Sequence, residues 1–73
     1  MIIEVGKKYR HFKGGEYEVI AIGKHTETME DMAVYRSLLD GKVWIRPLIM
    51  FQEPLDKNKY KDIEQEYRFK EIE

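Results

Sequence analysis

The chain has 73 residues, which leaves room for one small domain and no second hydrophobic core. It contains no cysteine, which excludes disulfides and a cysteine-based zinc site, and no apolar run approaches the roughly 18 residues of a membrane-spanning helix. Its 13 basic and 14 acidic residues give a net charge of −1, so no global field attracts nucleic acid or an anionic membrane. We expect a single soluble, cytoplasmic domain over residues 1–73, without a membrane partner.

The first predicted hairpin joins strands over residues 7–13 and 16–24. Gly14-Gly15 lies between them and favours a type I′ turn, in which both central residues have positive φ. Strict alternation along the second strand predicts one face made of Tyr17, Val19 and Ala21.

A second hairpin follows the polar loop 25–30. Its strands are predicted over residues 32–38 and 43–46, because Asp40-Gly41 between them is a strong hairpin signal. Pro47 then ends the strand and is well placed to begin a helical turn over residues 48–51.

The rest of the chain divides into a charged linker, residues 54–60, and a closing tail, residues 61–73. The tail fits a turn near 60–64 followed by a strand near 67–72, although Tyr60, Ile63 and Tyr67 also have helical spacing. The whole pattern predicts a mainly β fold, a small five-stranded SH3-like antiparallel barrel with a short helical turn.

Five separated sequence blocks resemble the small bacterial family catalogued as domain of unknown function 1653. The resemblance covers about residues 6–53, and only a segment near Tyr67-Arg68-Phe69 continues it. The five blocks are Tyr9–Gly14, Tyr17–Val19, His25–Thr28, Val34–Arg36 and Trp44–Phe51. Ile45 stands where we expect valine, a substitution that keeps the volume nearly constant. The family name implies that no activity is assigned, so the resemblance supplies no substrate or cofactor.

His25 and Glu27 are the nearest approach to a metal pair, because side chains at i and i+2 of an extended segment point the same way. A zinc site needs three or four ligands, so His11 would have to complete it. The alternative is that His25 and Glu27 order their loop through hydrogen bonds to its backbone. We predict no metal, no cofactor and no catalytic residue.

Arg36 shares a predicted strand face with Val34 and Leu38, where an apolar residue is expected. If it is buried, it needs a carboxylate partner such as Glu18 or Glu27. If a bulge or the strand end turns it outward, it lies in water.

Trp44 and Arg46 share a face, opposite to the face of Val43 and Ile45. Tryptophan and arginine are enriched at binding hot spots, and Tyr35 on the neighbouring strand could flank them. The alternative is that this face is the second side of the core.

Three functions remain open. The first is a non-enzymatic binding module, a monomer or weak homodimer, that recognises a small anionic ligand or a short acidic peptide. Its polar aromatic pocket is predicted to consist of His11, His25, Glu27, Tyr35, Arg36, Trp44 and Arg46.

The second function is single-stranded nucleic-acid binding through the basic strand 7–13, which carries Lys7, Lys8, Arg10 and Lys13. These charges have a simpler explanation, a charged edge strand that prevents aggregation. The third function is a small enzyme that uses His25 and Glu27 as general base and orienting partner.

Overall fold

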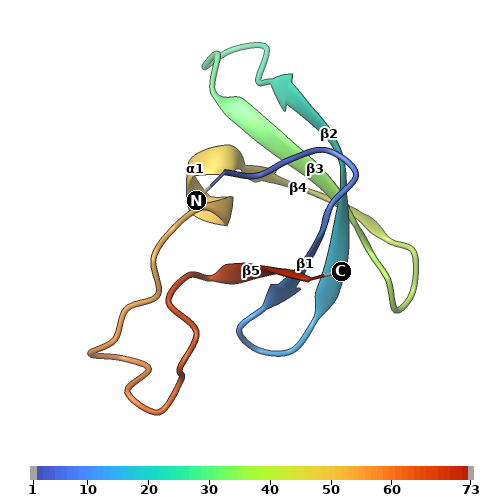
Figure 1. Ribbon diagram of the computed structural model, residues 1–73. Helices are drawn as coiled ribbons and strands as arrows, with labels where there is room; N and C mark the ends of the chain where they lie inside the picture. The colour runs from blue at the N-terminus through green and yellow to red at the C-terminus, as the bar shows by residue number, and fades with distance from the viewer. Residues whose placement is uncertain (1, 73) are drawn as a thin grey trace.

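The computed structural model describes residues 2–72 and contains one antiparallel sheet with a single short helix (Figure 1). The elements follow in the order β1 (Lys8–His11), β2 (Glu16–Lys24), β3 (Asp31–Ser37), β4 (Val43–Pro47), α1 (Leu48–Phe51) and β5 (Phe69–Ile72). The five strands are ordered β4-β3-β2-β1-β5, and every pair of neighbours is antiparallel. The predicted mainly β fold is therefore confirmed. None of the helices formed by the described residues has the length and apolar character needed to cross a membrane.

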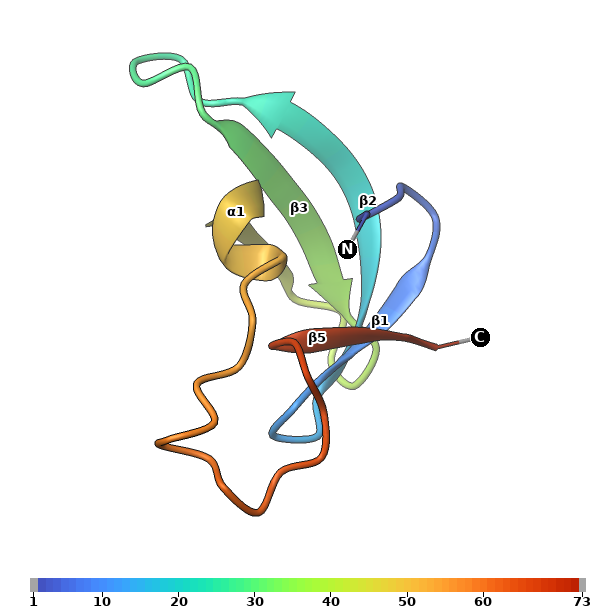
Figure 2. The same ribbon diagram turned by 60° about the vertical axis from the view of Figure 1, so that its left-hand side comes forward.

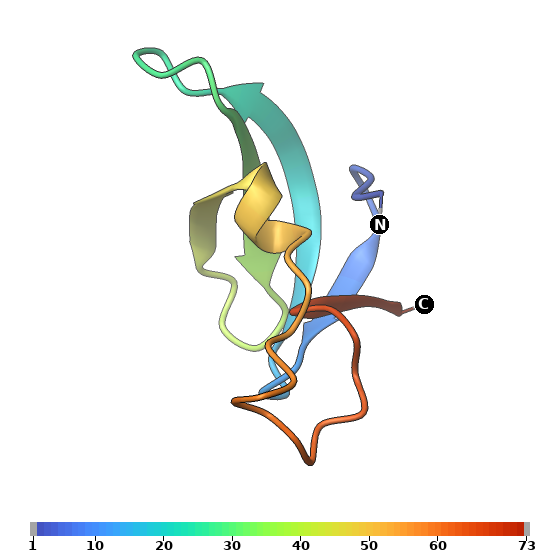
Figure 3. The same ribbon diagram turned by 90° about the vertical axis from the view of Figure 1, so that its left-hand side faces the viewer.

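The two edges of the sheet are β4 and β5. Between residues 2 and 72 these two strands do not pair, so the sheet curls without closing, and the SH3-like barrel is not confirmed. Figures 2 and 3 show α1 lying against β3, where it follows directly from β4.

The first hairpin has a longer loop than the sequence predicts. Four residues separate β1 from β2, and His11 N–H donates to the Gly15 carbonyl across them at 2.7 Å. Of the two glycines in this loop, Gly14 has a positive φ of 108° and Gly15 does not, so the predicted two-residue type I′ turn is wrong. Glycine is required at position 14 because other side chains rarely adopt this conformation.

A β-bulge in β2 changes which residues face the core. The register shifts between Val19, which pairs with Tyr35, and Ala21, which pairs with Val34. Ala21 is exposed and Val19 is fully buried, so strict alternation placed Ala21 on the wrong face. An extra residue in one strand displaces every later side chain by one position.

The core is an aromatic cluster between the concave face of the sheet and α1. The rings of Phe51 in α1 and Phe69 in β5 stack in parallel, 3.9 Å apart. Tyr9 and Tyr35 meet Phe51 edge-on at 5.6 and 5.1 Å. A four-residue helix has no intrinsic stability, so α1 depends on burying Phe51 in this cluster.

The segment between α1 and β5 is held by side chains that bond to its backbone. The Gln65 amide donates to the carbonyls of Arg10, Tyr67 and Arg68, and Lys57 Nζ donates to those of Ile63 and Gln65. No helix forms between residues 52 and 72, so the helical alternative for the tail is wrong. The closing strand exists, but it begins at Phe69.

Candidate functional site

Three inward-facing side chains from different strands meet at one end of the aromatic core. His11 on β1 pairs with Phe69 on β5, and their rings meet edge-on with centroids 5.0 Å apart. The Arg46 guanidinium on β4 lies over the same Phe69 ring, 5.7 Å from its centroid. The curl of the sheet thus brings β4 toward β1 and β5 without strand pairing.

Arg46 differs from the other arginines in its ion pairing. The chain has four arginines, and three of them each bond a glutamate: Arg10 to Glu16 at 2.7 Å, Arg36 to Glu18 at 2.6 Å, and Arg68 to Glu53 at 3.0 Å. Among residues 2–72, Arg46 has no carboxylate partner, and its buried Nη1 has no hydrogen-bond acceptor. Packing against Phe69 therefore holds a cation that no described residue neutralises.

His11 presents a neutral donor beside this cation. Burial, together with the positive charges of Arg46, Arg68 and Lys13, lowers the pKa of His11 to about 4. Its Nδ1 accepts a hydrogen bond from the Lys13 N–H at 3.1 Å. At neutral pH the ring proton therefore lies on Nε2, which makes that nitrogen a donor.

Arg68 is a further cation at this site that the sequence reasoning did not include. Its charge lowers the pKa of His11, one guanidinium nitrogen bonds Glu53, and its buried Nε has no acceptor among the described residues. The segment Tyr67-Arg68-Phe69, which continues the family resemblance, could have indicated Arg68 as a site residue. The same segment contains Phe69, whose ring contacts both His11 and Arg46.

The two other aromatic candidates have different surroundings. Tyr35 is 5% exposed and belongs to the core, where it meets Tyr17, Phe51 and Phe69 edge-on. Trp44 is opposite Tyr35 in the register and is 50% exposed. Its strand position places it on the same face as Arg46, so it borders the site from the solvent side.

Arg36 lies outside this arrangement. It occupies the outer face of β3, between the inward-facing Tyr35 and Ser37, and bonds the cross-strand residue Glu18 in an exposed pair. The strand face that carries Arg36, which the sequence pattern predicted to be apolar, is thus the outer face of the sheet. Val43 and Ile45 are exposed on the same face. The structure does not bring Arg36 together with Arg46.

His25 and Glu27 lie in the loop between β2 and β3. His25 Nδ1 accepts hydrogen bonds from the N–H groups of Glu27 and Thr28, at 3.1 and 3.3 Å. The imidazole thus orders its own loop, and the structure does not bring it to His11. Within residues 2–72, no three histidine, aspartate or glutamate side chains are grouped closely enough to hold a metal ion.

The basic strand is not an edge of the sheet. β1 lies between β2 and β5, so the edge-strand explanation of its charges is wrong. The exposed side chain of Arg10 is bound by Glu16, and Lys13 lies over the Phe12 ring at 5.7 Å. Part of the predicted phosphate-binding charge is therefore already compensated.

The comparisons with known proteins agree with the resemblance seen in the sequence. The model of a family described as "Protein of unknown function (DUF1653)" matches residues 7–71, a range that extends beyond residue 53 through most of β5. No curated protein and no solved structure gives a significant match.

Proposed function

Because the chain belongs to the DUF1653 family of proteins of unknown function, we propose from its geometry that it is a non-enzymatic module that binds an anionic group at Arg46. The group is a carboxylate or phosphate carried by a small molecule or a short acidic peptide. The observation that carries this proposal is the half-buried Arg46, held over Phe69 without a carboxylate partner among the described residues.

An unpaired guanidinium at this position is costly unless a ligand completes it. A buried polar group without a partner costs about 1–3 kcal/mol, and a charged group costs more. A carboxylate or phosphate offers two oxygens in the geometry of the guanidinium fork, so it restores both hydrogen bonds and charge balance.

The neighbours of Arg46 support the same ligand chemistry. Neutral His11 offers an Nε2–H donor, and Arg68 adds positive charge that Glu53 only partly offsets. Half-exposed Trp44 can cover a flat group attached to the anion, because aromatic faces stack favourably on such groups. The site so defined keeps His11, Trp44 and Arg46 from the sequence prediction and adds Arg68 and Phe69. It omits His25, Glu27 and Arg36, and also Tyr35, which belongs to the core.

The proposal is tested by titrating the protein with inorganic phosphate and with phenyl phosphate, using fluorescence of its single tryptophan, Trp44, as the signal. We expect both anions to bind, with phenyl phosphate tighter because its ring adds contact with Trp44. Arg46→Gln should weaken binding by at least about tenfold, equivalent to 1.4 kcal/mol.

Arg36→Gln is the matched control, because it removes the same charge from the outer face of the sheet. Its affinity should equal that of the parent protein. Equal loss in both variants would indicate non-specific charge attraction, and absence of binding by either anion would reject the proposal.

A further inference from the structure

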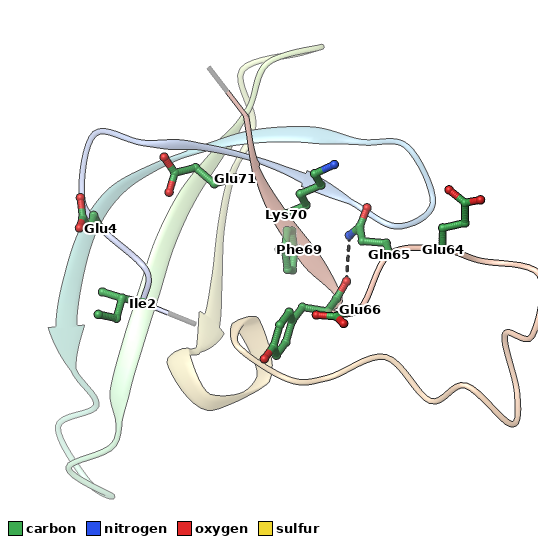
Figure 4. A pocket seen from close by; sticks show the side chains of 9 residues that line it. Ile2, Glu4, Glu64, Gln65, Glu66, Phe69, Lys70 and Glu71 are labelled. Atoms are coloured by element: carbon green, nitrogen blue, oxygen red, sulfur yellow. Dashed lines mark hydrogen bonds between the residues drawn. The ribbon is translucent and has the colours of Figure 1, made fainter.

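An open groove of about 800 Å³ lies beside β5, at the unpaired edge of the sheet, and shares Phe69 with the site around Arg46. One wall is the N-terminal segment with Ile2 and Glu4, and the other is β5 with the chain that leads into it (Figure 4). Phe69 and Lys70 both line the groove, although successive side chains of a strand point to opposite faces. The groove therefore reaches the edge of the strand as well as the face on which Phe69 lies.

The backbone along this edge has unused hydrogen-bonding groups. Phe12 N–H donates to the Arg68 carbonyl, and the pairing of β1 with β5 continues this register to Lys8 and Ile72. Alternate residues of an antiparallel strand bond to opposite sides, so Lys70 and Ile72 bond to β1. Phe69 and Glu71 direct their N–H and carbonyl groups away from β1, where no other described strand receives them.

The charge of the groove is strongly negative. Its lining contains one cation, Lys70, and four exposed glutamates, which are Glu4, Glu64, Glu66 and Glu71. None of these four carboxylates forms an ion pair with another residue of the described range 2–72. The apolar residues that line it are Phe69, Tyr67 and Ile2.

We infer that this groove binds an extended peptide segment rich in lysine and arginine, which adds as a strand to the free edge of β5. The backbone groups of Phe69 and Glu71 supply the strand pairing, and the carboxylates select positive side chains. Side chains at alternate positions of the added strand lie about 6.6 Å apart, so several cations can reach the groove from one face.

A second copy of this chain does not fit as the occupant. Of its two basic segments, residues 57–61 have Lys57 already bound to the carbonyls of Ile63 and Gln65, and residues 7–13 contain β1, whose backbone is already paired with β2 and β5. Using that segment as an added strand would require the sheet to come apart. The occupant is therefore a different polypeptide.

The test uses a synthetic peptide in which lysine alternates with threonine, with binding measured by calorimetry and by the amide NMR signals of Phe69 and Glu71. We expect saturable binding that shifts both signals. Two matched peptides probe the mechanism: one has glutamate in place of lysine, and one has N-methyl groups on the amides that face the strand. Neither should bind, because the first reverses the charge and the second removes the backbone donors.

The protein variants carry a matched control as well. Glu4→Gln combined with Glu71→Gln should weaken the lysine peptide by at least about tenfold, whereas Glu27→Gln in the loop between β2 and β3 should leave it unchanged. Equal binding of the N-methyl peptide would overturn strand addition, and unchanged binding by the double variant would overturn the groove. A protein dimer that the double variant dissociates would show that a second copy occupies it.

Discussion

Arg46 differs from the other three arginines in what surrounds its guanidinium. Arg10, Arg36 and Arg68 lie beside glutamates, whereas Arg46 lies against an aromatic ring and has no carboxylate partner among residues 2–72. An exposed ion pair contributes about 0–1 kcal/mol, so the ion pairs of Arg10 and Arg36 add little to the free energy of unfolding. An arginine positioned by packing alone is more informative, because its charge remains available to a ligand.

At the same scale, His11 gives the protein a defined response to pH. Its pKa is about 4 in the folded protein against an ordinary value of 6.5. Between these pH values the unfolded chain binds more protons than the folded protein. The contribution of neutral His11 to the free energy of unfolding is therefore complete above about pH 6.5 and is lost as the pH decreases toward 4. His11→Asn should make this fall shallower, as measured by urea denaturation across the pH range.

Phosphate provides the complementary test of His11. An anion bound beside the ring favours its charged form, so phosphate should raise the pKa of His11 in an NMR titration. The resonance of the other histidine, His25, serves as the internal reference because its ring lies in the loop between β2 and β3. A His11 titration that phosphate does not change would place the anion elsewhere.

At the scale of elements, α1 and β4 bury their aromatic residues to very different extents. Phe51 is the one buried residue of α1 and stacks on Phe69, whereas Trp44 of β4 leaves half of its surface in water. The short helix therefore depends on one ring, while β4 is held mainly by its pairing with β3.

This difference predicts unequal effects of truncation. Phe51→Ala should lower the free energy of unfolding by about 3–5 kcal/mol, as expected for a core phenylalanine. Trp44→Ala should lower it by only about 1–2 kcal/mol, because half of the surface of Trp44 stays exposed to water in the folded protein and contributes no burial energy. Urea denaturation followed by circular dichroism measures both, and a larger loss for Trp44→Ala would show that Trp44 is a core residue.

At the scale of the whole molecule, charge argues against nucleic acid as the principal ligand. The net charge is −1, and on β1 the side chain of Arg10 is bound by Glu16. The acidic groove beside β5 adds further repulsion toward an extended polyanion such as a nucleic-acid strand.

We therefore expect single-stranded oligonucleotides to bind no tighter than about 10⁻⁵ M at physiological salt, within the non-specific range. Fluorescence anisotropy over a series of salt concentrations measures this affinity. Submicromolar binding that decreases when Lys8 and Arg10 are replaced by glutamine would restore the basic strand as the functional surface.

Much of the architecture follows from local sequence signals. Asp40-Gly41 predicts the second hairpin, Pro47 predicts the start of α1, and the five-stranded antiparallel arrangement follows from the turns between apolar segments. The family resemblance is equally a property of the sequence, and the match over residues 7–71 confirms it. These features depend on residues close together in the chain, which is why they can be predicted from the sequence.

Only the tertiary structure decided which strand faces point toward the core and which residues far apart in the sequence come into contact. The bulge after Val19 and the outward face of Arg36 arise from pairing between strands, and no local pattern specifies that pairing. The same curl brings Arg46 and His11 to the ring of Phe69 while leaving His25 in its own loop. The sequence by itself determined the strands, the turns and the candidate residue types; their convergence depended on the curvature of the sheet, which is set by packing of the aromatic core.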